Sequence, residues 1–220
     1  YPDAIERTAG FDLQNTLLEA RRSVGADFAY WPKYKLVVLV YTAQQYRELR
    51  RELPEWVAGH YDGKIRVPLP GNGLDRSEVI RTLTHEYTHA VIHDLTRDRL
   101  PVWFNEGLAE YEAWKTTRRP WRFLPKAMAQ GMLIPWASLA SQFSMSSSMD
   151  IALLGYEQSH SILMYLVQRY GFWRIRKILE AVNGGTSLES ALTSQVHVKL
   201  SRLETEWRHW LEEGVGSSSR

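Results

Sequence analysis

THEYTH, at residues 84–89, is the stretch from which the rest of this chain can be interpreted. It has the form H-E-x-x-H. On an α-helix, residues four apart share one face and lie about 6 Å apart along the axis, so His85 and His89 can direct two imidazoles at one cation. Glu86 lies about 100° around the helix from His85, near enough to reach a water on that cation. The motif therefore predicts a zinc site with two His ligands and a Glu general base.

A helix is predicted around this motif, from Asp75 to Leu95. Asp75 and Glu78 match a D-x-x-E capping pattern, and no Pro or Gly interrupts the segment. An amphipathic core helix that holds two histidines by chance would show the same pattern, so the motif alone leaves both interpretations open. An apolar stripe runs beside the histidine face and consists of Val79, Leu83, Ala90 and Ile92.

The third ligand decides between the two interpretations, because a catalytic zinc usually has three protein ligands and one water. Residues 101–111, PVWFNEGLAEY, predict a second helix with Pro101 just outside its start. H-E-x-x-H followed by N-E on a second helix resembles the gluzincin metallopeptidases, and WFNEGLAEY is especially similar to their peptidase MA-like group. The resemblance implies that Glu106 is the third zinc ligand. The connection of residues 90–105 is slightly shorter than in the large gluzincin branches.

The same resemblance implies roles for three further side chains. Glu110 follows Glu106 by one turn, and thermolysin-like enzymes use an acid at that spacing to hold a zinc-binding imidazole. The alternative for Glu110 is a solvated surface carboxylate. Residues 156–159 resemble a Y-x-Q-S segment of the peptidase MA-like group, so Tyr156, or failing that His160, would donate to the oxyanion. The alternative for both is a buried core side chain.

Other zinc classes fit the sequence less well. Metzincins need a Gly and a third His where this chain has Ile92 and Leu95, and deformylase-like enzymes need a Cys ligand, which is absent. His93 is four residues past His89 on the same face. Three successive turns cannot easily reach one cation, so we expect His93 to support a ligand or to pack.

Residues 56–69 predict a β-hairpin, because Asp62-Gly63 is a strong turn signal between two strand-like runs. Gluzincins keep an edge strand above the zinc helix, and by resemblance one strand of this hairpin would pair with the peptide substrate. Pro68 and Pro70 favour an edge location. Which strand faces the substrate stays open, as does the alternative of an ordinary hairpin. The candidate substrate-binding residues are Gly59, His60 and Tyr61.

The order of elements indicates an α+β fold of zincin-like type, with a small N-terminal sheet and a helical C-terminal lobe. We expect one domain at residues 1–213, with lobes at about 1–98 and 99–213, followed by a tail at 214–220. Residues 34–41 (YKLVVLVY) predict a buried central strand. Helices are expected at 11–24 ending before Gly25, at 42–49 capped by Thr42, at 124–131, at 150–170 ending before Gly171, at 173–182 and at 200–213. Ser187 is expected to cap a short turn, and residues 141–149 to form a polar loop.

Composition limits the function further. The chain has 220 residues, a net charge of +2 with mixed charges and no cysteine, which argues against nucleic acid, disulfides and thiolate metal sites. The longest apolar run, residues 36–41, is far too short to span a membrane. The chain begins at Tyr1 with no targeting segment, as a mature or excised fragment would. Localisation therefore stays open, an extracytoplasmic one included, and so does the oligomeric state.

Together these patterns predict a metallopeptidase with one Zn²⁺ per chain and a peptide or protein as substrate. The aminopeptidase G-x-M-E-N segment is absent, which mildly favours an endopeptidase. The alternative is a peptidase-like module that binds zinc or peptide with little turnover, although such a module has no need of Glu86. A structural zinc site is disfavoured, because it would need four Cys or His ligands.

Overall fold

The computed structural model describes residues 7–49, 59–68, 76–117, 119–143 and 148–216. It is mostly helical with one small three-stranded sheet, which confirms the α+β class. The chain divides into two compact units, residues 1–91 and 92–220, which are considered separately below. Among the described residues, no helix is both long and apolar enough to cross a membrane.

The first unit contains the sheet, whose strand order is β1-β3-β2. β3 lies in the centre, parallel to β1 and antiparallel to β2, with Tyr61 opposite Ile65 in the hairpin. Gly63 forms the turn with a φ of +91°, a conformation that glycine adopts without steric cost. The predicted hairpin is therefore confirmed in its described part. The strands are β1 (Val38–Tyr41), β2 (His60–Tyr61) and β3 (Ile65–Pro68).

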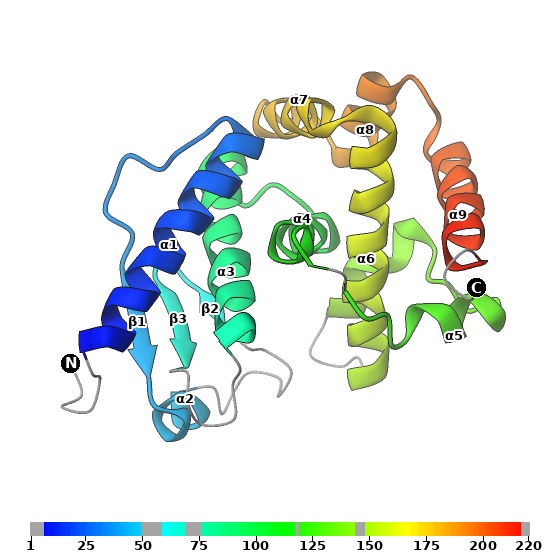
Figure 1. The fold of residues 1–220 in the computed structure, drawn as a ribbon. Coiled ribbons are helices and arrows are strands. Elements are labelled where there is room, and N and C mark those ends of the chain that lie inside the picture. Colours follow the sequence, from blue (N-terminus) through cyan, green and yellow to red (C-terminus); the bar gives the residue numbers. More distant parts are fainter. Residues whose placement is uncertain (1–6, 50–58, 69–75, 118, 144–147, 217–220) are drawn as a thin grey trace. The chain divides into compact units, whose positions relative to one another are not determined.

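Helices α1 (Arg7–Phe28) and α3 (Arg76–Thr96) run alongside this sheet, and α2 (Ala43–Leu49) follows β1 (Figure 1). One face of β3 is buried together with apolar positions of α1 and α3, and this forms the core of the unit. Thr42 caps α2 as expected: its Oγ1 accepts from the Gln45 N–H at 3.2 Å, and Gln45 Oε1 accepts from the Thr42 N–H at 2.9 Å. The core residues include Val24, Phe28, Ile65, Val67, Leu83 and Val91.

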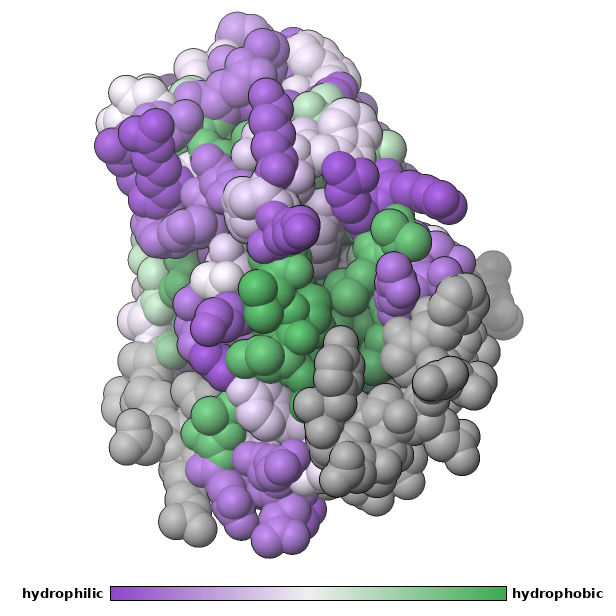
Figure 2. All heavy atoms as spheres, turned by 90° about the vertical axis from the view of Figure 1, so that its left-hand side faces the viewer, coloured by the Kyte–Doolittle hydropathy of each residue, from purple (hydrophilic) through white to green (hydrophobic). Residues whose placement is uncertain are grey.

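Three expectations for this unit were wrong. The strand at residues 34–41 is shorter and lies at an edge of the described sheet, with all four residues of β1 half-buried. Figure 2 shows the molecule from the side on which α1 and β1 lie, and apolar side chains gather at the centre of this face. Pro68 does not mark an edge strand; it is the last residue of the central strand β3, opposite Tyr41 of β1.

The third wrong expectation is the end of α1, which continues through Gly25 to Phe28. The indole of Trp31 folds back over this glycine, and a Cβ at residue 25 would lie only 2.0 Å from its Nε1. The close approach of the Trp31 indole, rather than a helix end, therefore explains why residue 25 is a glycine. The helix ends at Ala29, which adopts a left-handed φ of +50°.

The second unit is helical and is built around α6 (Met149–Tyr170), against which α4, α5, α7, α9 and the 3₁₀-helix η1 pack. Ser148 caps α6 by accepting from the Ile151 N–H, and Gly171 ends it at a φ of +79°. Buried tryptophans link α4, η1 and α9. The ring centroid of Trp136 lies 5.9 Å from that of Trp103 and 5.9 Å from that of Trp207. The remaining elements are α4 (Val102–Trp114), α5 (Leu124–Ala129), η1 (Trp136–Phe143), α7 (Phe172–Asn183), α8 (Leu188–Val196) and α9 (Leu200–Gly216).

Three details of the second unit differ from expectation. The short turn after Ser187 is a nine-residue helix, α8, because the Ser187 hydroxyl caps it and an apolar face packs on α7. Part of the expected polar loop, residues 141–143, belongs to η1, whose Leu139 is fully buried. The expected tail begins inside α9, which extends to Gly216.

Some expectations concern residues outside the described part of the chain. These are the Asp75 cap, Pro70, most of the first hairpin arm at residues 56–58, the loop at 144–147 and the tail at 217–220.

Candidate metal centre

Helix α3 carries the H-E-x-x-H motif and brings its two histidines together as predicted. The Nε2 atoms of His85 and His89 lie 3.0 Å apart, and the two rings meet edge to face with their centroids at 4.6 Å. The hydroxyls of Thr84 and Thr88 bond back to backbone carbonyls four residues earlier, so neither competes for the space between the imidazoles. Two ring nitrogens therefore point at one place beside a single helix face.

The spacing of these nitrogens suits a metal ion. Two nitrogens at 2.0–2.1 Å from a tetrahedral zinc would be about 3.3 Å apart, close to the observed separation. Both histidines are half-buried, so the pair is neither sealed in the core nor freely solvated. A shared proton would also hold two imidazoles at this distance, which makes the third group decisive.

Glu106 is that third group. One ligand atom each from His85, His89 and Glu106 lies within 4.8 Å of the other two. Two imidazoles, which bind metals in their neutral form, and one carboxylate are a suitable set of donors for a divalent transition metal. The ligand set expected from the sequence is thus brought together and can hold a metal ion.

Gly107, the glycine of the N-E-G stretch, explains how α4 can carry Glu106 so close to its neighbour α6. A Cβ at residue 107 would lie 2.8 Å from the carbonyl oxygen of Ser159 and 2.7 Å from a methyl of Leu163. The two helices therefore touch at a point where only a glycine fits. This close contact between α4 and α6 at Gly107 sets the position of Glu106, the residue before it.

We expect Gly107→Ala to destabilise the fold, because the Ser159 contact is with backbone that cannot rotate away. Overpacking of a tight core contact typically costs about 1–3 kcal/mol. Urea unfolding of the wild type and the variant measures the loss. Gly131→Ala is the comparison variant: nothing lies within 4 Å of its added Cβ, so only the cost of its positive φ applies. Equal stability of Gly107→Ala and wild type would contradict the packing argument.

Glu86 is buried, with 4% of its surface exposed, on the same turn of α3 as His85. It lies against Gly59, the residue that precedes β2: a Cβ at residue 59 would be 2.6 Å from Glu86 Oε1 and 2.6 Å from the Thr82 methyl. The backbone before β2 therefore comes directly onto the carboxylate. This contact accounts for the glycine and brings the start of the hairpin to the motif.

The hairpin strand next to this carboxylate is β2, which forms an edge of the described sheet, while β3 is central. Of the two hairpin strands, only β2 thus offers a free edge within the described residues. His60 and Tyr61 are both half-buried, and His60 Nε2 lies 4.0 Å from Asp62 Oδ2.

In the second unit, Glu110 is bound by Arg119, whose guanidinium also reaches His160 Nδ1 at 3.5 Å. The ring of Trp121 lies 5.3 Å from that of His160, which is only 3% exposed. Burial, and secondly the charge of Arg119, lower the pKa of His160 to about 3. His160 is therefore neutral, and Glu110 is held in an ion pair rather than solvated. Arg119 could not be predicted from the sequence, because nothing along the chain connects it to Glu110 and His160.

The low pKa of His160 predicts a pH-dependent stability. The unfolded chain binds this proton near pH 6.5 and the folded chain only near pH 3, so falling pH favours unfolding between these values. The free energy of unfolding then falls by up to about 1.4 kcal/mol per pH unit, and it does not depend on this proton above pH 6.5. Urea unfolding from pH 4 to pH 7 measures it, and His160→Gln should flatten the curve. Parallel curves for both proteins would contradict the prediction.

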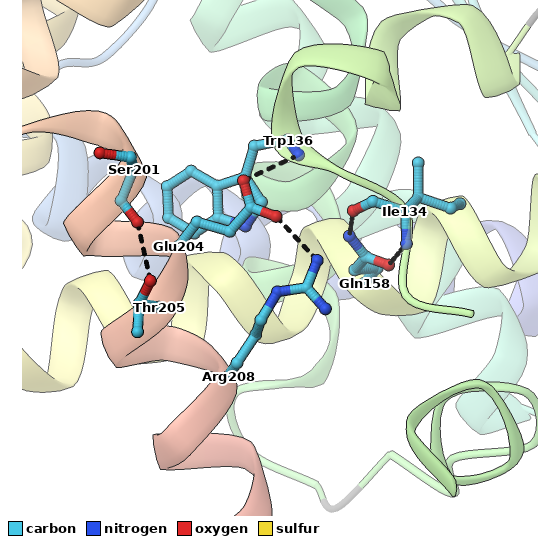
Figure 3. A network of polar contacts seen from close by, with 7 residues as sticks. All are labelled: Ile134, Trp136, Gln158, Ser201, Glu204, Thr205 and Arg208. Carbon is cyan, nitrogen blue, oxygen red and sulfur yellow. Dashed lines mark hydrogen bonds and ion pairs between the residues drawn. The ribbon is translucent and has the colours of Figure 1, made fainter. Parts of the chain in front are cut away.

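Tyr156 lies on the same helix as His160 and is half-buried, with its ring edge-on to Phe143 at 5.0 Å. The next residues of the Y-x-Q-S segment have structural roles. The Glu157 carboxylate accepts three backbone N–H bonds at the start of α5, and Gln158 pairs with both backbone groups of Ile134 (Figure 3). These contacts fix the segment between α4 and η1, which contains Arg119 and Trp121 at its beginning. Figure 3 also shows Glu204 of α9 between the Trp136 N–H and Arg208.

His93, the histidine one turn after the motif, lies at the end of α3. Its Nδ1 is 2.8 Å from a carboxylate oxygen of Asp98 in the following turn, and nearly half of its side chain is exposed. It is not part of the group formed by His85, His89 and Glu106.

A mostly helical protein with a His-His-Glu group on two consecutive helices falls in the class of candidate metal-binding enzymes. The family model of the Peptidase MA superfamily matches residues 64–213, more than half of the chain, and the chain belongs to this superfamily. The match covers both motif helices and α6, and it supports a peptidase-like function. No curated protein and no solved structure matches the chain.

Proposed function

We propose that this protein is a zinc-dependent peptidase that cleaves peptide bonds by hydrolysis. The observation that carries the proposal is the convergence of His85, His89 and Glu106 in a member of a peptidase superfamily. His85 and His89 would bind zinc through Nε2, and Glu106 through its carboxylate. When bound, zinc lowers the pKa of a water to about 7 and polarises the carbonyl of a substrate.

Glu86 would act as the general base. Its carboxylate is buried beside Gly59 and adjacent in sequence to a proposed ligand, without belonging to the ligand group. It would take a proton from the attacking water and pass it to the leaving amine. Burial keeps the carboxylate away from bulk solvent, which favours proton transfer between the carboxylate and the reacting atoms.

The substrate would bind in an extended conformation along β2. This strand is the hairpin edge nearest Glu86, and extended peptides add readily to such an edge through main-chain hydrogen bonds. Gly59, His60 and Tyr61 would then contact the substrate. Tyr156 or His160 would donate to the oxyanion, and Glu110 would orient an imidazole ligand. Because the substrate would run along a strand and no amine-binding G-x-M-E-N segment exists in the chain, we favour an endopeptidase.

The proposal is tested on purified protein with a pool of fluorogenic peptides blocked at both ends. We expect about one zinc per chain by elemental analysis, cleavage of internal bonds, loss of cleavage after chelation and recovery with zinc. Cleavage only of peptides with a free terminus would replace the endopeptidase by an exopeptidase. Bound zinc without any cleavage would favour the alternative, a peptidase-like module that binds zinc or peptide. A folded protein that takes up no zinc would contradict both.

A further inference from the structure

We propose that Arg119 is a positioning residue: it fixes His160 as the imidazole tautomer with its proton on Nε2 and holds the Glu110 carboxylate with the same guanidinium. The structure thereby assigns to α6 an N–H donor of constant direction, carried by a side chain that is 3% exposed. That this donor meets a substrate carbonyl or oxyanion rests on the proposed peptidase function. The fixed tautomer does not.

The tautomer follows from the chemistry of the arginine. A guanidinium has N–H donors and no acceptor. Arg119 Nη1 lies 3.5 Å from His160 Nδ1, so Nδ1 must accept in this contact and cannot carry a proton. A neutral imidazole has one ring proton, which is therefore on Nε2. Among the described residues, His160 Nε2 has no hydrogen-bond partner.

The surroundings of His160 also oppose a second proton. The side chain is almost completely buried, the Trp121 ring lies 5.3 Å from it, and the positive charge of Arg119 faces Nδ1. The carboxylate of this cluster is Glu110, and its charge is already paired with Arg119. The low pKa of His160 agrees with this arrangement.

Arg119 is itself held in place. Its guanidinium lies 5.8 Å from the Trp114 ring and 5.9 Å from the Trp121 ring, and the side chain is only 13% exposed. Tryptophan faces attract a cation and restrict its movement. Only arginine combines a permanent charge with several fixed donors, so it can serve a carboxylate and an imidazole at once, which a lysine cannot do with the same geometry.

The Nε2 atom of His160 is not among the fully buried side-chain atoms without a partner, so it is open to a water or a ligand that can satisfy its N–H. The group that would satisfy His160 Nε2 is an oxygen acceptor, such as a peptide carbonyl or the oxyanion derived from it. A histidine that could switch its proton between Nδ1 and Nε2 would present this donor only part of the time. Arg119 positions the donor by excluding the tautomer with its proton on Nδ1.

The test reads the tautomer directly. Protein with ¹⁵N-labelled histidine is examined by long-range ¹H–¹⁵N correlation spectra, and His160 is assigned by its absence in His160→Gln. We expect the neutral Nε2–H form throughout pH 5 to 8 in the wild type. Arg119→Met should yield a mixture of tautomers, and so should Arg119→Lys, which keeps the charge. Arg122→Met, an exposed neighbour, should leave the spectrum unchanged.

Two results would overturn the inference: an Nδ1–H or doubly protonated His160 in the wild type at pH 6, or an unchanged tautomer in folded Arg119 variants. Circular dichroism checks the fold, and Arg119→Lys serves as the informative variant if Arg119→Met does not fold. In the active enzyme, Arg119→Lys should lower kcat by about 10–100-fold, as loss of a supporting contact typically does. Inactive wild-type protein with the Nε2–H form would contradict the proposed function and leave the tautomer inference standing.

Discussion

Replacing Glu86 with glutamine is expected to abolish most hydrolysis while the protein keeps its zinc. An amide has nearly the same size as the carboxylate, so it fits the buried position against Gly59. It cannot accept the proton of the attacking water, and a positioned general base typically contributes about 10²–10⁴-fold to the rate. Turnover of a fluorogenic peptide and elemental analysis of the same preparation measure both properties.

The contrast between the two measurements is what makes this experiment informative. If Glu86→Gln loses zinc together with activity, Glu86 is a ligand and the roles proposed for the motif are wrong. If it keeps full activity, another group is the base. Glu78→Gln, an exposed carboxylate on the first turn of the same helix, is the matched control and should leave both properties unchanged.

The second large effect is the loss of metal on removal of a histidine ligand. His89→Ala or His85→Ala should reduce zinc content from about one per chain to near zero, since each removes one of three ligands. His93→Ala is the matched control: it removes a histidine from the same helix that bonds Asp98 and is not part of the group. Zinc retained by folded His89→Ala, or lost from His93→Ala, would contradict the proposed ligand set.

The two glutamates of α4 complete this test. Glu106→Gln should weaken zinc binding severely, because the carboxylate is proposed to bind the ion. Glu110→Gln should weaken it by about 10–100-fold, as expected for a group that supports a ligand. Zinc titration into both metal-free variants compares the affinities. If Glu110→Gln is the metal-free variant, the third ligand is one helical turn away from the position proposed here.

Much of the candidate centre follows from local rules. The i, i+4 spacing on an uninterrupted helix places His85 and His89 together, and this geometry does not depend on the rest of the fold. The Asp62-Gly63 turn and the Thr42 cap are equally local, since each depends on the backbone preferences of a few adjacent residues. The identity of Glu106 as a partner came from resemblance, because sixteen residues of connection, 90–105, have no fixed geometry in sequence.

The tertiary structure decided what depends on residues far apart in the chain. A continuous apolar run predicted a central strand at residues 34–41, yet β1 is at an edge, because strand order depends on which strands pair and not on hydrophobicity alone. Gly25 resembled a helix end, yet a tryptophan six residues later requires it. No pattern along the chain connects Arg119 with Glu110 or His160. Only folding brings it between Glu110 and His160, where burial gives its charge a definite chemical consequence.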